Sequence, residues 1–217
     1  MFKIKAGAKL LFIGDSITDA ERAKPAGEGL FGALGQGYVS QVDALIQSTY
    51  PERRIRVVNQ GTSGNTVLDL KARWQTDVVK QKPDWLSIMI GINDVWRQFD
   101  LPWQKETHVS LKVYSRTLEE LVSKTRRQVQ GLVLCTPFFI EPNPTDAMRV
   151  LMDQYGAAVK TIAKKHHAIF VDTQAAFNDF LAHYHPMSIA WDRVHPNPTG
   201  HMIITRAILR ALGYVWQ

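Results

Sequence analysis

Short apolar runs alternate along the chain with longer stretches that repeat with the period of an α-helix. Five of the runs predict strands, at residues 10–13, 55–59, 85–90, 132–136 and 168–172. The helical stretches between them are typical of the crossover connections that join parallel strands. The pattern therefore predicts an α/β fold with a five-stranded, mostly parallel sheet.

Four stretches place their apolar residues on one helical face, which can cover the sheet. In chain order, these residues are Val39, Val42, Leu45 and Ile46; Leu118, Leu121 and Val122; Met148, Met152, Tyr155, Val159 and Ile162; and Ile204, Ile208 and Leu212. The last helix is expected to begin at Pro198, with Asn197 as its N-cap, and to end near Gly213.

Two segments, at residues 17–37 and at about 92–107, are too long to be ordinary connections and are expected to be loops. Both follow predicted strand ends, where open parallel sheets bind their ligands. We therefore expect a functional site at the carboxyl edge of the sheet.

The composition indicates one globular domain over residues 1–217. The chain is 45% hydrophobic, 10% aromatic and 21% charged, which suits one sizeable core. Its apolar runs fall far short of the roughly 20 residues of a transmembrane helix, so no membrane partner is expected. The net charge of +6 is spread over isolated basic pairs, which argues against a nucleic-acid partner.

The chain ends and the single cysteine bear on location and assembly. An apolar stretch of about four residues follows the lysines near the N-terminus, whereas a secretory signal needs roughly 7–15. Cys135 is the only cysteine and is interpreted as a buried thiol in a strand. These features favour the cytoplasm. Tyr214 and Trp216 are expected to be exposed, which favours a homo-oligomer.

Polar and small residues follow the first three predicted strands. Ser16 comes after the first strand in a Gly-Asp-Ser sequence, Gly64 after the second and Asn93 after the third. Each stretch alone is typical of a turn. Together they allow the N–H groups of Ser16 and Gly64 and the amide of Asn93 to face one oxyanion. Asp15 and Asp94, beside these residues, are expected to orient the turns.

Asp192 and His195 lie three residues apart, just before the last predicted helix. In a turn, this spacing lets the carboxylate accept from one imidazole nitrogen while the other nitrogen faces a nucleophile. An Asp-x-x-His pair alone is weak evidence of catalysis. Its combination with three strand-end motifs favours nucleophilic catalysis by Ser16.

Other patterns have competing interpretations. His183, His185 and His201 lie near Asp192 and His195, but no cysteine pair or His-Glu-x-x-His motif accompanies them, so no metal is expected. Residues 27–32 match G-x-G-x-x-G, although about a dozen residues separate them from the preceding strand. We expect a loop there rather than a dinucleotide site.

Taken together, these blocks resemble the SGNH, or GDSL-type, hydrolases, a family named for its serine, glycine, asparagine and histidine. Residues 14–17 read Gly-Asp-Ser-Ile, with isoleucine where the family usually has leucine. The resemblance carries the family glycine onto Gly64, its asparagine onto Asn93, and its aspartate and histidine onto Asp192 and His195. The whole chain, including residues 91–98 and 190–196, is also similar to the bacterial acetylxylan esterases of this family.

The resemblance implies a flavodoxin-like three-layer α/β/α fold, no cofactor, and a small acetylated sugar as substrate. The implied reaction is release of acetate from acetylated xylo-oligosaccharides. Ser16 attacks the ester, His195 acts as the base held by Asp192, and an acyl-enzyme forms. The N–H groups of Ser16 and Gly64 and the side chain of Asn93 stabilise the oxyanion.

Trp96, Trp103 and Trp191 are candidate sugar-binding residues, since a flat ring suits a pyranose face, but packing accounts for each equally well. Two other functions stay open. One is a short-chain carboxylesterase, thioesterase or lysophospholipase without carbohydrate preference, which needs an acyl channel. The other is a non-catalytic carbohydrate-binding or interaction protein that kept the fold, although loss of activity normally removes a catalytic residue.

Overall fold

Five strands form one sheet in the computed structural model, which describes residues 1–216. They are β1 (Lys9–Gly14), β2 (Arg56–Gly61), β3 (Trp85–Met89), β4 (Gly131–Cys135) and β5 (Ile169–Val171). The strand order is β2-β1-β3-β4-β5, and every neighbouring pair is parallel. The five predicted strands are confirmed to within two residues at each end, and the sheet is parallel throughout.

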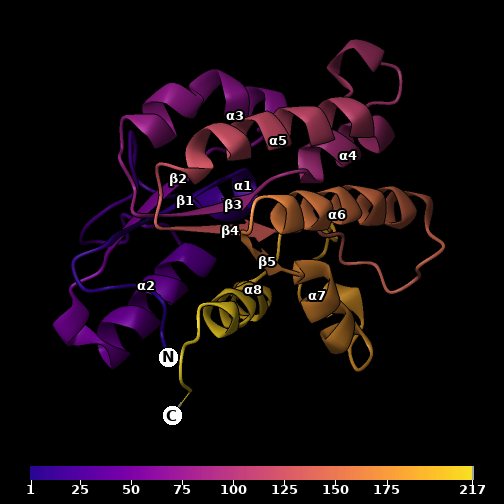
Figure 1. Cartoon of the computed structure of the whole chain (residues 1–217). Coiled ribbons are helices and arrows are strands. Elements are labelled where there is room, and N and C mark those ends of the chain that lie inside the picture. The colour runs from indigo at the N-terminus through magenta and orange to yellow at the C-terminus, as the bar shows by residue number, and fades with distance from the viewer. Residues whose placement is uncertain (217) are drawn as a thin grey trace.

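Helices cover both faces of the sheet (Figure 1). They are α1 (Ser16–Asp19), α2 (Tyr38–Thr49), α3 (Val67–Trp74), α4 (Ile92–Asp100), α5 (Leu111–Arg126), α6 (Ala147–Lys165), α7 (Thr173–Leu181) and α8 (Pro198–Ala211). Helices α3, α5 and α6 pack side by side on one face, and α2, α8 and α7 on the other. The expected three-layer α/β/α architecture is confirmed. Within residues 1–216, no helix has both the length and the hydropathy that crossing a bilayer requires.

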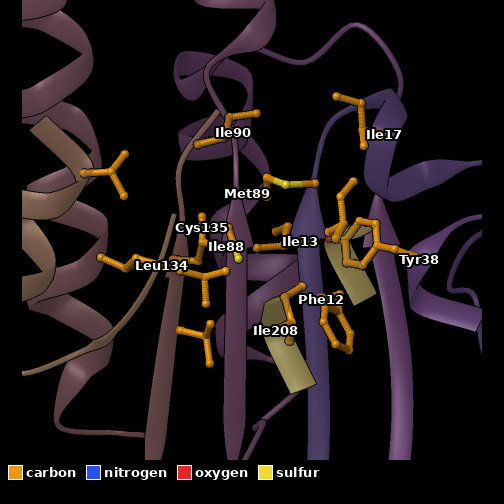
Figure 2. Packing of buried hydrophobic residues seen from close by; sticks show 14 of the residues in the cluster. Phe12, Ile13, Ile17, Tyr38, Ile88, Met89, Ile90, Leu134, Cys135 and Ile208 are labelled. Atoms are coloured by element: carbon orange, nitrogen blue, oxygen red, sulfur yellow. The ribbon is translucent and has the colours of Figure 1, made fainter. Parts of the chain in front are cut away.

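The core lies on both sides of β1. Residues 10–13 are fully buried, and successive side chains of a strand point to opposite faces. Phe12 packs edge-on against Tyr38 of α2, with ring centroids 5.7 Å apart, close to Ile208 of α8 (Figure 2). Burial on both faces explains why the strand sequences are continuous apolar runs rather than alternating ones.

The predicted helical faces are buried as expected. Val39, Val42 and Ile46 of α2 lie in the core, as do the predicted faces of α5 and α6. The side chain of Asn197 accepts hydrogen bonds from the first turn of α8, which begins at Pro198. An N-cap of this kind contributes about 1 kcal/mol of helix stability. The predicted start of the last helix is therefore confirmed.

Two expectations were wrong. Residues 92–107 were expected to be a loop, but they contain helix α4, whose first turn buries the polar residues Asn93 and Asp94. Buried polar residues break the apolar period by which helices are recognised. Tyr214 was expected to be exposed, but it is half-buried against Phe2 and Tyr50. Trp216 is exposed, as expected.

The segment at residues 17–37 is a loop beyond α1. Its G-x-G-x-x-G sequence does not join a strand to a helix. Instead, Gly27 exchanges two backbone hydrogen bonds with Asn59 of β2, with N···O distances of 2.9 and 2.8 Å. This loop therefore extends the sheet edge rather than cradling a pyrophosphate.

Candidate active site

Ser16 is the first residue of α1 and follows directly on β1. The carboxylate of Asp15 caps the helix by accepting from the N–H of Ile17 at 3.0 Å. A Cβ atom on Gly14 would lie 2.3 Å from the carbonyl oxygen of Met89, so β1 can approach β3 this closely only with glycine at that position. The Gly-Asp-Ser sequence thus combines close strand packing, a helix cap and a serine at the carboxyl edge.

The side chains of Ser16, His195 and Asp192 form a hydrogen-bonded chain. Ser16 Oγ lies 2.9 Å from His195 Nε2, and His195 Nδ1 lies 2.6 Å from Asp192 Oδ2. If Nδ1 carries the proton and donates to Asp192, Nε2 is free to accept the proton of the serine hydroxyl. The predicted approach of two residues 179 positions apart is confirmed.

Asp192 also holds the backbone of its own turn. Its Oδ1 accepts from the N–H groups of Val194 and His195 at 3.0 and 2.8 Å. Burial alone would raise the pKa of Asp192, but the hydrogen bonds from the imidazole and these two N–H groups outweigh burial and lower the pKa. Asp192 is therefore an ionised partner for the imidazole.

The loop that carries His195 is anchored to the segment after β4. The carbonyl oxygen of Arg193 accepts from the N–H of Ile140 at 2.9 Å, and its guanidinium pairs with the largely buried carboxylate of Glu141. Arg193 has a φ of +61°, a conformation that is costly for a residue with a side chain. These contacts hold that conformation between Asp192 and His195.

Gly64 lies in a tight turn after β2. The N–H of Asn65 donates to the carbonyl of Thr62, and Gly64 has the φ of +80° that the third position of such a turn requires. The N–H of Thr62 donates to the carbonyl of Gly14 at 3.1 Å, which places the turn beside the start of the Ser16 segment. Within residues 1–216, no protein acceptor pairs with the N–H groups of Ser16 or Gly64.

Asn93 joins the same cluster from the first turn of α4. Its Nδ2 donates to the carbonyl of Asn65 at 3.0 Å, and its Oδ1 accepts from Arg97 at 3.4 Å. This pairing fixes the orientation of the amide and leaves its second N–H free. The structure therefore brings the three predicted oxyanion donors to one edge of the sheet.

Asp15 and Asp94 are buried behind these groups. Asp94 accepts from the N–H of Val67, at the start of α3, at 3.0 Å. Burial raises the pKa of both carboxyls to about 7. Their hydrogen bonds to backbone N–H groups confirm the expectation that they orient turns.

The other histidines have different environments. His201 is buried, its Nδ1 accepts from the N–H of Tyr38, and burial lowers its pKa to about 4. His185 accepts from the N–H of Met187 and caps a short helix. In the described part of the chain, no three His, Cys, Asp or Glu side chains group in a way that would hold a metal ion.

The three candidate tryptophans lie at different distances from the triad. The ring of Trp96 meets His195 edge-on, with centroids 5.9 Å apart, and the guanidinium carbon of Arg97 lies over the Trp96 ring, 5.0 Å from its centroid. Trp191 is 82% exposed and directly precedes Asp192 in the chain. Trp103 is also exposed, but it lies three residues beyond Asp100, the last residue of α4, which is itself about 10 Å along the helix axis from Asn93.

Sequence reasoning missed Arg73 of α3, whose guanidinium contacts the turn that carries Gly64. It donates to Asn65 Oδ1 at 2.6 Å and to the carbonyls of Gln60 and Gly14. No local motif includes Arg73. An arginine within an amphipathic helix that follows a strand-end turn is the only signal in the sequence.

A nucleophile after the first strand, oxyanion donors after the second and third, and an Asp-x-x-His turn before the last helix define one class of hydrolase. The chain belongs to the GDSL-like lipase/acylhydrolase family, whose sequence model matches residues 12–203. The expected family and fold are thereby confirmed.

Particular relatives are close over the whole chain. An acetylxylan esterase of Geobacillus stearothermophilus is 62% identical, over 99% of this chain and 98% of the relative. The crystal structure of that esterase matches with a TM-score of 0.98 at the same identity and coverage. An alpha/beta hydrolase enzyme from the metagenome of Lake Arreo, Spain, is 54% identical over 100% of both chains, also with a TM-score of 0.98.

Proposed function

We propose that this protein is a serine esterase that removes acetyl groups from acetylated xylo-oligosaccharides. The observation that carries the proposal is the chain of contacts from Ser16 Oγ through His195 to Asp192. The Geobacillus relative is an acetylxylan esterase, and structures of it described as acetyl-xylooligosaccharide esterase support the substrate class. Catalytic mutants of that relative replace a serine, an aspartate and a histidine at the same spacing as Ser16, Asp192 and His195.

In the first half of the reaction, Ser16 Oγ attacks the acetyl carbonyl carbon while His195 Nε2 takes the hydroxyl proton. The carbonyl oxygen becomes an oxyanion that accepts from the N–H groups of Ser16 and Gly64 and from Asn93 Nδ2. When the tetrahedral intermediate collapses, the bond to the sugar oxygen breaks. His195 then gives its proton to that oxygen, which leaves acetyl-Ser16 and a free sugar hydroxyl.

The second half uses the same groups. His195 Nε2 takes a proton from water, whose oxygen attacks the acetyl-serine. The same donors stabilise the new oxyanion, and collapse returns the proton to Ser16 Oγ and releases acetate. Asp192 stabilises the imidazolium in both halves.

The three candidate tryptophans are assigned to binding the sugar of the substrate. Trp191 offers an exposed ring next to the triad, and Trp96 covers one side of His195. Trp103 lies beyond the end of α4 and suits a more distant sugar unit. Flat aromatic faces against pyranose rings orient the ester for attack.

The test combines substrate and variant. Acetate release from acetylated xylo-oligosaccharides of defined linkage should be lost in Ser16→Ala. It should persist in Ser40→Ala, a matched control whose half-buried hydroxyl donates to Gly37. Turnover by Ser16→Ala would identify another nucleophile. Absence of turnover by the parent, with sugar binding retained, would favour a binding protein.

A nitrophenyl ester series separates the esterase alternatives. Activity should fall steeply from acetyl to octanoyl esters if the acyl site is small. Efficient octanoyl hydrolysis would favour the general carboxylesterase, thioesterase or lysophospholipase.

We also propose that the protein is a single domain, assembles as a homo-oligomer and is located in the cytoplasm. A single domain over residues 1–217 is supported by the one sheet and by the hydrogen bond from the N–H of Lys3 to the carbonyl of Leu212. The exposed ring of Trp216 supports a homo-oligomer, which light scattering tests. The sole cysteine, Cys135, is buried, in keeping with a cytoplasmic location that cell fractionation tests.

A further inference from the structure

The guanidinium of Arg73 joins three segments at the carboxyl edge of the sheet. Its Nη2 donates to the carbonyl of Gly14 at 2.8 Å, at the end of β1, and its Nη1 donates to the carbonyl of Gln60 at 2.7 Å, near the end of β2. Its Nε donates to Asn65 Oδ1 at 2.6 Å. Gly14 lies two residues before Ser16, and Asn65 directly follows Gly64. One side chain therefore links the segments that supply two of the three oxyanion donors.

The guanidinium is itself held in place. Its side chain is 16% exposed, and Nη1 also donates to Asp77 Oδ2 at 2.9 Å, one helical turn further along the chain. Four of its five N–H groups thus have protein acceptors, in the fixed plane of the guanidinium. A lysine carries the same charge but cannot reach acceptors on three segments at once.

The turn that Arg73 contacts has few other supports. Gly64 is exposed, and a Cβ atom added there would meet no atom within 4 Å, so packing does not fix its position. The turn is held instead by polar contacts: Arg73 to the side chain of Asn65, Asn93 to the carbonyl of Asn65, Ser63 to Asp19, and the N–H of Thr62 to the carbonyl of Gly14. An oxyanion hole works only if its donors are in place before the charge develops.

We propose that Arg73 is a positioning residue for the reaction, which holds the Gly64 N–H in line with the Ser16 N–H through Asn65 and the strand-end carbonyls. The inference rests on the proposed function, because it assigns Arg73 to the oxyanion hole of that ester hydrolysis. The oxyanion exists only in the transition state and the tetrahedral intermediates. Loss of this support therefore lowers kcat and leaves KM almost unchanged.

The test compares Arg73→Lys with Arg53→Lys on nitrophenyl acetate. Arg53 is a matched control, since it is also half-buried and donates to the two backbone carbonyls of Phe2 and Ile4, away from the triad. Arg73→Lys should lower kcat about 10- to 100-fold with KM within about twofold, somewhat less than deletion of a donor would. Arg53→Lys should keep the parental kcat. A parental kcat in Arg73→Lys would overturn the inference. A fall in kcat that is fully explained by the fraction of unfolded protein in the sample would overturn it as well.

A second variant keeps the test decisive if Arg73→Lys folds poorly. Asn65→Ala removes one acceptor of the guanidinium at a half-exposed site and should lower kcat about tenfold. The two substitutions together should lower log kcat by less than the sum of their separate effects, because both break one linkage. Additive effects, or a parental kcat in Asn65→Ala, would refute a route through Asn65.

Chemical rescue gives a readout that a purely structural role would not produce. Free guanidinium ion should raise the kcat of Arg73→Ala at concentrations that leave the parent unchanged. No rescue of folded Arg73→Ala would count against positioning by the guanidinium. The Ser16→Ala assay stands apart: if Ser16→Ala stays active, the proposed function fails, whereas an inactive Ser16→Ala with an unaffected Arg73→Lys refutes only the role of Arg73.

Discussion

Replacing Asn93 by alanine isolates one oxyanion donor. The substitution removes the free Nδ2–H, and loss of one such donor costs about 10²- to 10³-fold in kcat, or about 3–4 kcal/mol of transition-state stabilisation. It also removes the 3.0 Å hydrogen bond to the carbonyl of Asn65, in the Gly64 turn. Loss of a partly buried hydrogen bond costs about 1 kcal/mol of folding stability, which lowers Tm by about 2–4 °C.

The two effects are separated by measuring steady-state kinetics on acetyl esters below the Tm of the variant. We expect the fall in kcat with KM unchanged, because the substrate carbonyl carries no full charge until Ser16 attacks. Asn93→Asp serves as the isosteric comparison: it keeps the shape but replaces the donor with an acceptor, so its kcat should be at least as low. If Asn93→Ala kept the parental kcat and raised only KM, Asn93 would bind the ground state, and the assigned oxyanion hole would be wrong.

Three other substitutions test the site and its surroundings. Trp191→Ala should raise KM for acetylated xylo-oligosaccharides about five- to tenfold but leave nitrophenyl acetate unaffected; equal losses would mean that Trp191 only supports the Asp192 turn. Asp192→Asn should lower kcat about 10³- to 10⁴-fold in a folded protein, and a near-parental rate would reduce the triad to a Ser16–His195 pair. The third substitution, His201→Gln, tests a pH effect, because folding lowers the pKa of His201 from 6.5 to about 4. Between these pH values the unfolded chain binds a proton at His201 that the folded chain does not bind. The free energy of unfolding therefore falls as the pH falls from 6.5 to about 4. Denaturant titrations at several pH values in this window should show that the free energy of unfolding of the parent falls by about 3 kcal/mol more than that of His201→Gln. The pH-dependent contributions of Asp15 and Asp94 are common to both proteins and cancel in this difference. Parallel pH profiles of the two proteins would refute the prediction.

The strands could be predicted from the sequence because β1 to β4 are almost wholly buried on both faces and therefore stand out as apolar runs, while the partly buried β5 is apolar as well. The edge at which Ser16, Gly64 and Asn93 meet followed from the same pattern, since parallel strands bring their carboxyl ends together. The approach of His195 to Ser16 needed the resemblance as well, because nothing in the intervening sequence specifies how that loop crosses the sheet. The catalytic roles of these residues stay predictions until the variants are assayed.

Helix α4 and the role of Arg73 could not be predicted, for related reasons. The first turn of α4 uses its buried positions for Asn93 and Asp94, whose partners lie on the turn after β2 and at the start of α3. The acceptors of Arg73 lie on β1, on β2 and in the turn after β2. Hydrogen bonds between segments far apart in sequence leave no local period, so only the folded chain reveals them.

The 179 residues between Ser16 and His195 also have a consequence for biosynthesis. At about 5–20 residues per second, a ribosome needs roughly 10–40 s to pass from the nucleophile to its base. For less than half of that time, until the ribosome has passed Met89, β1 lacks one neighbour or both, since β2 begins at Arg56 and β3 at Trp85. A nascent chain therefore cannot hydrolyse esters until nearly all of it has been made. In timed cell-free translation, esterase activity should begin only when completed chains appear. Chains that terminate before His195 should have no esterase activity.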